Sequence, residues 1–245
     1  MLLIRQTLFH ICFYGYMFIW CLLLVPPLLL PRKYYMLFLQ AYFDSNYYVE
    51  KWVLGLDYEV RGAEHIPQGQ SFLVAAKHYS TYETFKIHLL FKDPAIILKR
   101  ELALIPIWGW LALKAGMIAI NRSTGESSMK SIVAGANRLK AEGRPVVIFP
   151  QGTRVDISDT PANKPYKFGI VRMQEATQLP ILPMATNSGL FWPRRSFFVK
   201  PGKVIFEFFP PIMPGQDLKT THQQMAEIIE TNSNRLVQET LSKST

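Results

Sequence analysis

A histidine and a glutamate lie five residues apart, directly after a short apolar run. The run, residues 71–76, has the length and composition of a buried strand, and His78 and Glu83 follow it. Active sites of α/β proteins gather at the carboxyl edge of the sheet, where this histidine is expected. Glu83 could accept a ring N–H of His78, which would fix the tautomer and stabilise the charged imidazolium. The pair therefore predicts a general base.

The same residues allow two other interpretations. Ser80 and Glu83 match the S-x-x-E pattern of a capping box, in which the glutamate only satisfies backbone N–H groups at a helix start. Ser80 could also be a nucleophile activated by His78, but the G-x-S-x-G motif of serine hydrolases is absent from the sequence. A capping role for Ser80 is favoured, and the role of Glu83 stays open between the histidine and the helix.

A second polar group follows a later apolar run. Residues 149–154 read FPQGTR and lead into a basic segment at residues 164–172. The turn offers backbone N–H groups which, together with Thr153 and the guanidinium of Arg154, could bind a phosphate monoester. If the strands are parallel, this turn lies at the same sheet edge as His78, and the two groups could share one substrate. The alternative is an ordinary strand-to-helix turn with a surface arginine.

The elements that must position these residues are short strands alternating with helices. Apolar runs typical of buried strands occupy residues 71–76, 95–98, 117–120, 146–149, 181–185 and 204–209. Helical patterns occupy residues 81–91, 129–139 and 222–241. This alternation predicts an α/β fold with a largely parallel central sheet flanked by helices.

The N-terminal residues predict membrane association. Residues 8–30 carry no acidic or basic side chain other than His10, and about 20 apolar residues suffice to cross a bilayer. Pro26 and Pro27 should kink or end a helix, and a second apolar, aromatic stretch covers residues 34–49. A helical hairpin in one leaflet and a single span are both open; a cleaved signal peptide is disfavoured because no A-x-A-like site follows. We expect residues 1–50 to form a membrane-embedded helical segment and residues 51–245 the catalytic domain.

Charge and cysteine content narrow the partners. The chain has 27 Lys+Arg against 18 Asp+Glu, a net charge of +9, which favours anionic partners such as phospholipid headgroups. Basic residues follow the apolar segment more than they precede it, which favours a catalytic domain on the cytoplasmic face of the cell membrane, the inner membrane in a bacterium. Cys12 and Cys21 both lie in the apolar segment, so no thiol nucleophile is expected in the main body. No metal site is expected either, because the histidines lack ligand-like spacing.

These blocks, taken together, resemble the 1-acylglycerol-3-phosphate O-acyltransferase family, bacterial type. The likeness covers roughly residues 57 to 210 and consists of four blocks in the family's order. They are His78 with Glu83; Lys99, Arg100, Glu101 and Leu102 with Pro106 and Gly109; residues 149–154; and the apolar stretch at residues 179–185. Four ordered blocks make a specific signal, whereas one block alone would have many false positives.

The resemblance implies a role for each matched residue. His78 would be the base and Glu83 its partner. The substrate phosphate would be bound by Gly152, Thr153, Arg154, Lys99 and Arg122, and the substrate positioned by Gln151, Glu101 and Arg100. Two positions depart from the commoner family pattern, with Glu83 for Asp and Gln151 for Glu. A glutamine can bond a glycerol hydroxyl or nearby backbone but cannot act as a base, so a catalytic role for Gln151 is in doubt.

The implied reaction moves an acyl group from acyl-CoA or acyl carrier protein to the sn-2 hydroxyl of 1-acylglycerol 3-phosphate, giving phosphatidic acid. No cofactor beyond the thioester co-substrate is expected; the partners are lysophosphatidic acid, the donor and membrane lipids, and no nucleic acid. The hairpin and residues 102–113 would receive acyl chains from the bilayer, although core packing explains that stretch equally well. Two alternatives remain: an acyltransferase for glycerol 3-phosphate or a lyso-aminolipid, and a non-catalytic, membrane-tethered module that binds anionic ligands.

Overall fold

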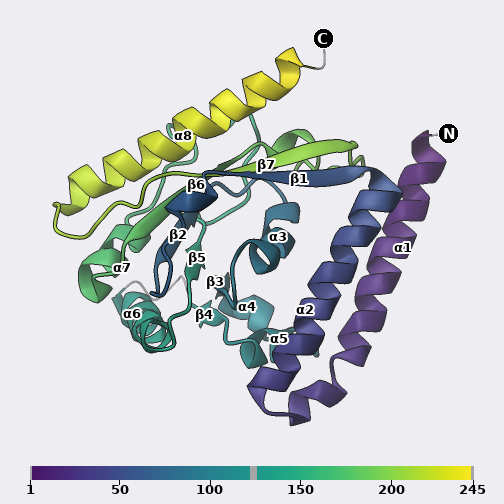
Figure 1. Ribbon diagram of the computed structural model, residues 1–245, viewed down its shortest axis with the longest axis horizontal. Helices are drawn as coiled ribbons and strands as arrows, with labels where there is room; N and C mark the ends of the chain where they lie inside the picture. Colours follow the sequence, from purple (N-terminus) through teal and green to yellow (C-terminus); the bar gives the residue numbers. More distant parts are fainter. Residues whose placement is uncertain (1, 122–125, 244–245) are drawn as a thin grey trace.

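The centre of the molecule is a seven-stranded sheet (Figure 1). The computed structural model describes residues 2–121 and 126–243. The strands are β1 (Leu56–Arg61), β2 (Leu73–Ala76), β3 (Ala95–Lys99), β4 (Ile118–Ile120), β5 (Val146–Ile148), β6 (Ile181–Thr186) and β7 (Gly202–Phe208). Their order is β1-β7-β6-β2-β5-β3-β4, and only the β6–β7 pair is antiparallel. The prediction of a largely parallel sheet is confirmed.

Both faces of the sheet are covered, which is why its central strands are apolar throughout. In β2, Leu73 and Ala75 point into one core, and Val74 and Ala76 point into another. The first core is covered by α6 (Glu126–Ala141), α7 (Gly169–Thr177) and α8 (Leu218–Ser242); the second is covered by α3 (Tyr82–Leu90) and part of α1 (Leu2–Leu23). Short 3-10 turns occur at η3 (Ala63–His65) and η5 (Ser188–Leu190).

Strand β1 was not among the predicted strands. Its sequence, LDYEVR, alternates apolar and polar residues and lacks the continuous apolar run of the other strands. It occupies an edge of the sheet, where it pairs only with β7 among the described strands. An edge strand is covered on fewer sides than a central one, so its sequence carries a weaker apolar signal.

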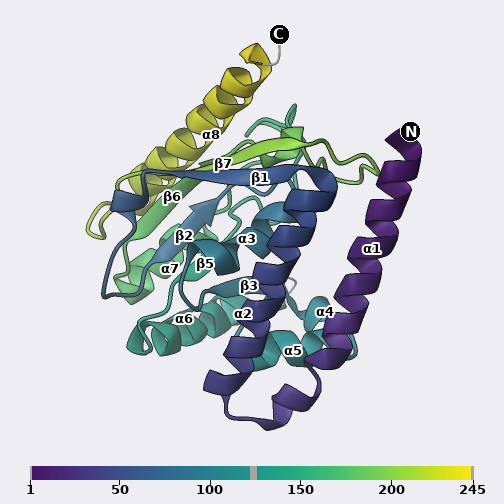
Figure 2. The same cartoon turned by 45° about the vertical axis from the view of Figure 1, so that its right-hand side comes forward.

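The N-terminal helices form an antiparallel hairpin that stands beside the sheet (Figures 1 and 2). Helix α1 is followed by η1 (Pro26–Leu29) and α2 (Arg32–Val49), so the helix ends just before the two prolines, as predicted. Aromatic contacts join the hairpin arms: Tyr42 packs against both Tyr16 and Trp20. Among the described residues, one segment, Gln6–Leu29, is long and apolar enough to cross a membrane.

The hairpin is attached to the domain at both ends of α2. At its start, Arg32 donates to the Asp93 carboxylate at 2.7 Å and to the Ala115 carbonyl at 2.8 Å. At its end, the π-helical turn η2 (Glu50–Leu54) continues α2 to Gly55, whose φ of 70° turns the chain into β1. The division of the chain at residues 50 and 51 stays a prediction.

Two short helices were not predicted as helices. α4 (Arg100–Ala103) and α5 (Trp108–Lys114) lie between β3 and β4, beside the hairpin turn (Figure 2). They contain the apolar stretch at residues 102–113. Leu111 packs with Tyr35 and Leu39 of α2 in a core that also includes Ala115, so this part of the stretch does belong to a core.

Candidate active site

Three polar segments meet at the carboxyl edge of the sheet. His78 follows β2, Lys99 ends β3, and residues 149–154 follow β5. Because β5 lies between β2 and β3 and all three strands run parallel, their carboxyl ends point to the same edge. The predicted meeting of the histidine and the FPQGTR turn is confirmed.

The imidazole of His78 is held by a buried carboxylate. Its Nδ1 lies 3.2 Å from Oε1 of Glu83, and the Glu83 side chain is fully buried whereas that of His78 is 17% exposed. With the Nδ1 proton donated to Glu83, the lone pair of Nε2 is left for a substrate. The ring also stacks on Phe149, with centroids 4.0 Å apart, which fixes its plane. This is the arrangement of a general base.

Glu83 also starts helix α3, so the two interpretations of its role hold together. The same Oε1 accepts the backbone N–H groups of Tyr79 at 2.6 Å and Ser80 at 2.7 Å. The Ser80 hydroxyl is buried and accepts the backbone N–H of Tyr82, the first residue of α3, at 3.1 Å, so it caps the start of the helix. These two hydrogen bonds from the backbone hold the Glu83 carboxylate in place beside His78.

The FPQGTR turn is fastened to the histidine segment. Val155 donates its N–H to the carbonyl of His78 itself, at 2.7 Å. Gly152 has a φ of 73°, a conformation that glycine adopts without the steric cost other residues meet. Arg154 is aimed across the site, where its Nη1 donates to the Thr81 hydroxyl at 3.0 Å. One turn thus fixes both the base and a cation.

The predicted phosphate ligands Gly152, Thr153, Arg154 and Lys99 all line one cavity together with His78. Thr153 and Lys99 are exposed, and Arg154 is partly buried. A guanidinium and an ammonium that line one cavity with an imidazole offer an anionic group two partners of opposite charge. Arg122 lies outside the described residues.

The three predicted positioning residues do not line this cavity. Gln151 is 4% exposed, and its Nε2 donates to the Lys164 carbonyl at 3.0 Å, which fastens the turn to the following segment. Arg100 and Glu101 are exposed on α4. For Gln151 the placement supports the backbone-bonding role. The positioning roles of Arg100 and Glu101 stay predictions.

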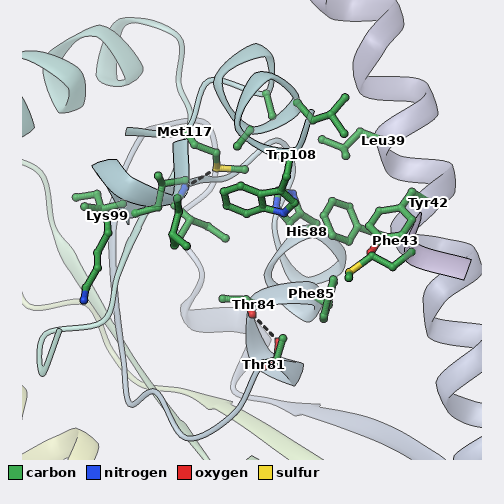
Figure 3. Close-up of a pocket in the computed structure, with 18 of the residues that line it drawn as sticks. Leu39, Tyr42, Phe43, Thr81, Thr84, Phe85, His88, Lys99, Trp108 and Met117 are labelled. Carbon is green, nitrogen blue, oxygen red and sulfur yellow. Dashed lines mark hydrogen bonds between the residues drawn. The ribbon is translucent and has the colours of Figure 1, made fainter. Parts of the chain in front are cut away.

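The cavity has a volume of about 570 Å³ and runs from the polar residues to the hairpin. Figure 3 shows Lys99 at one end, Tyr42 and Phe43 of α2 at the other, and Trp108 and His88 between them. The apolar part is formed by residues in or next to α1, α2, α3, α5, β3 and β4: Met17, Trp20, Leu24, Leu39, Phe85, Ile96, Leu111 and Met117. One end can bind charge and the other an apolar chain.

Sequence reasoning missed the face of α3 that lines the cavity. Thr81, Thr84, Phe85 and His88 follow the spacing i, i+3, i+4, i+7, so they share one face of the helix (Figure 3). His88 stacks on Phe43 at 4.0 Å, and burial lowers its pKa to about 3. Because this face begins three residues after His78, its periodicity could have identified the residues.

A buried ion pair joins α3 to the hairpin and was also missed. Lys86 bonds Glu50 of η2, both side chains are fully buried, and Asn46 donates to the same carboxylate at 2.9 Å. The ammonium lies 4.6 Å from the centroid of the Tyr82 ring. The pair holds the helix of Glu83 against the end of α2.

Comparison with known proteins agrees with this geometry. The Acyltransferase family model matches residues 57–187. A 1-acyl-sn-glycerol-3-phosphate acyltransferase from Pseudomonas aeruginosa is 33% identical over 205 residues, which are 82% of this chain and 77% of that protein. A protein of the same name from Cocos nucifera is 31% identical over 66% of this chain and 51% of its own length.

A solved structure shares the fold. The crystal structure of the 1-acyl-sn-glycerophosphate (LPA) acyltransferase PlsC from Thermotoga maritima superposes with a TM-score of 0.79 and 21% identity, covering 96% of this chain and 98% of that one. Both the His78–Glu83 pair and the turn at residues 149–154 lie inside the matched range of the family model. The chain therefore belongs to the Acyltransferase family.

Proposed function

We propose that the protein transfers an acyl group from a thioester to the free sn-2 hydroxyl of 1-acylglycerol 3-phosphate, giving phosphatidic acid. The observation that carries the proposal is a base and two cations at one end of an apolar cavity: His78, Arg154 and Lys99 line the same space as Phe43 and Trp108. A lysophosphatidate has a phosphate monoester, a hydroxyl and an acyl chain, and the relatives from Pseudomonas aeruginosa and Cocos nucifera are named for this reaction.

The charged end explains the choice of a phosphorylated acceptor. The guanidinium of Arg154 is oriented by Thr81 and lies next to Gly152 and Thr153, so the phosphate would meet a preset cation and the turn. Charge-assisted hydrogen bonds of this kind contribute about 1.5–3 kcal/mol each. A neutral acceptor would gain nothing from these two cations.

The apolar end would hold an acyl chain. Its volume of about 570 Å³ falls within the about 300–1,000 Å³ typical of small-molecule sites. Each methylene that leaves water for such a cavity gains about 0.8 kcal/mol. The acyl chain of the thioester would therefore anchor its reacting carbonyl near His78. The donor is acyl-CoA or acyl carrier protein, since both present the same thioester, and no further cofactor takes part.

The reaction needs one proton acceptor. Nε2 of His78 takes the hydroxyl proton as the oxygen bonds the thioester carbonyl carbon, and Glu83 balances the imidazolium. Collapse of the tetrahedral intermediate breaks the C–S bond, and the thiolate receives the proton from His78. Holding hydroxyl, carbonyl and imidazole in one site converts an encounter into a positioned attack.

The site would work at the membrane. The segment Gln6–Leu29 is apolar enough to enter a bilayer, and α1 and α2 form one wall of the cavity. The lysophosphatidate acceptor has an acyl chain that partitions into lipid, so a cavity beside the hairpin can take it without transfer through water. The basic residues that follow the apolar segment favour the cytoplasmic face of the cell membrane.

The test is an assay of purified protein in detergent micelles with lysophosphatidate and either acyl-CoA or acyl carrier protein thioester. Thiol release and phosphatidate formation are followed together, for wild type and for a folded His78→Ala variant. We expect phosphatidate from wild type and its loss in the variant. If the protein acylates glycerol 3-phosphate or a lyso-aminolipid and not lysophosphatidate, that molecule is the acceptor instead. No turnover with any donor would favour a binding module.

A further inference from the structure

Helices α4 and α5 present an apolar surface to solvent, here called the α4–α5 patch. It consists of Leu104, 69% exposed, Ile105, 45%, Trp110, 56%, and Leu113, 51%. Leu104 and Ile105 are adjacent in the turn between the helices, and Trp110 and Leu113 lie one turn apart on α5. Water-soluble surfaces seldom gather apolar side chains of this size, so the patch indicates a partner.

The backbone of the turn sets the direction of these side chains. A Cβ on Gly109 would lie 2.0 Å from the Ala103 carbonyl oxygen, so only glycine lets α5 pack this closely on α4. Ile107 has a φ of 64°, a rare conformation for a β-branched residue, and packs against the hairpin core. With Ile107 turned inward, the turn leaves Leu104 and Ile105 outside.

The patch is continuous with the hairpin. The opposite side of α5 carries Leu111 and Ala115, which pack on α2, and the Tyr35 hydroxyl donates to the Leu111 carbonyl at 2.9 Å. Helices α4 and α5 lie beside the hairpin turn (Figure 2), where Leu29 is 91% exposed. A hairpin that enters lipid would therefore bring α5 to the lipid with it.

The charges around the patch match an anionic surface. Lys99 precedes α4, Arg100 is its first residue and Lys114 ends α5, against one acidic residue, Glu101, in this segment. Basic residues near an anionic leaflet are each attracted to it, and tryptophans prefer the interface between headgroups and chains. A patch with apolar residues at its centre and basic residues at its ends fits this interface.

The inner side of the same segment lines the cavity, through Leu102, Trp108 and Ala112. We propose that the α4–α5 patch inserts into an anionic phospholipid bilayer as a second membrane contact beside the hairpin, and so opens the cavity toward the acyl chains. Its use in catalysis rests on the proposed function; its insertion does not. An acidic carrier protein and a second copy of this chain are the other occupants that the test separates.

Depth measurement tests the insertion without any turnover. In a Cys12→Ser/Cys21→Ser background, Leu104→Cys is spin-labelled in the full chain reconstituted into phosphatidylglycerol-containing vesicles, and collisions with oxygen and with a water-soluble nickel chelate are compared. Met213→Cys is the matched control: Met213 is 59% exposed and follows Ile212. Ile212 pairs with Ile181, the first residue of β6, at the amino end of the parallel strands, whereas α4 follows the carboxyl end of β3.

We expect the label at residue 104 to collide several-fold more with oxygen than with the chelate, and the label at residue 213 to show the reverse. Equal access of the chelate to both sites would overturn the proposal. Shielding of residue 104 from both reagents would overturn it in favour of a second copy of the chain.

An activity measurement separates the membrane from a carrier protein. Leu104→Asp/Trp110→Asp is compared with Met213→Asp, after both are shown to fold by circular dichroism. For the double variant, we expect about tenfold lower turnover of vesicle-embedded lysophosphatidate and unchanged turnover in detergent micelles. For Met213→Asp, we expect unchanged turnover in both. A loss confined to carrier-protein thioesters, in vesicles and micelles alike, would assign the patch to that partner. If wild type makes no phosphatidate, the proposed function fails while the depth measurement still decides the insertion.

Discussion

The two ends of the cavity are built in different ways. At the polar end, His78, Glu83 and Arg154 come from segments within a few residues of strand ends, and backbone bonds such as Val155 N–H to the His78 carbonyl fix them. At the apolar end, the walls come from α1, α2, α3 and α5, elements far apart in the sequence that meet by side-chain packing.

The difference teaches where precision is required. Proton transfer depends on distances near 3 Å, so the base and its partner are held by several hydrogen bonds. An acyl chain needs only apolar volume, which many combinations of side chains provide. Substitutions at the polar end should therefore lower turnover or substrate binding. Substitutions in the packed elements should lower the free energy of unfolding.

The largest effect is expected at the base. His78→Ala removes the proton acceptor, and we expect turnover to fall about 10²–10⁴-fold in the micelle assay with little change in KM. The matched control is His222→Ala, which removes a histidine that stacks on Phe168 outside the cavity and should leave turnover unchanged. Equal losses in the two variants would mean that His78 acts on folding instead of on the reaction.

The buried pair of Glu50 and Lys86, which joins α3 to the end of the hairpin, comes next. Glu50→Gln leaves the Lys86 ammonium buried without its carboxylate, and we expect the free energy of unfolding to fall by about 3–5 kcal/mol. Urea unfolding followed by tryptophan fluorescence measures the loss. Glu50→Gln/Lys86→Met should recover most of it, because the buried charge is gone.

The surface pair Arg138–Glu142 supplies the control for this comparison. Its side chains are 61% and 42% exposed, so Arg138→Gln should change stability by less than about 1 kcal/mol. A loss in Glu50→Gln as small as this one would show that the buried pair does not hold α3 to the hairpin.

The cation at the polar end should affect binding more than chemistry. We expect Arg154→Ala to raise the KM for lysophosphatidate by about 10–100-fold, the value of a lost charge-assisted hydrogen bond of about 1.5–3 kcal/mol. Arg154→Lys should recover only part of it, since an ammonium cannot bind bidentately. Arg172→Ala removes an equal charge at an exposed position outside the cavity, and a similar KM change there would reduce the role of Arg154 to net charge.

The smallest effect concerns the apolar end and depends on pH. Burial lowers the pKa of His88 to about 3, whereas an unfolded chain has an ordinary histidine near 6.5. Below pH 6.5 the unfolded state binds the additional proton, so folding loses free energy as pH falls, reaching about 2 kcal/mol at pH 5. Asp93 opposes this shift and Arg144 adds to it.

His88→Phe keeps a ring against Phe43 and cannot be protonated. We therefore expect its melting temperature to fall less than that of wild type between pH 7 and pH 5, in the same micelles. Parallel curves for the two proteins would show that His88 is not buried in its neutral form.

The sequence by itself determined the polar end and the class of fold. Parallel central strands are buried on both faces, so β2, β3, β5 and β6 appear as short apolar runs, and the residues after them fall at one edge by geometry alone. The chemistry of His78, Glu83 and Arg154 is therefore readable from local motifs.

The tertiary structure alone decided what those motifs face. Long-range packing places the hairpin over α3 and α5 and creates the cavity, pairs Glu50 with Lys86 across 36 positions, and turns Gln151 to the Lys164 carbonyl and not to the site. Apolar packing is non-directional, so an amphipathic stretch specifies that it will be covered but not by which partner. That choice requires the whole chain in place.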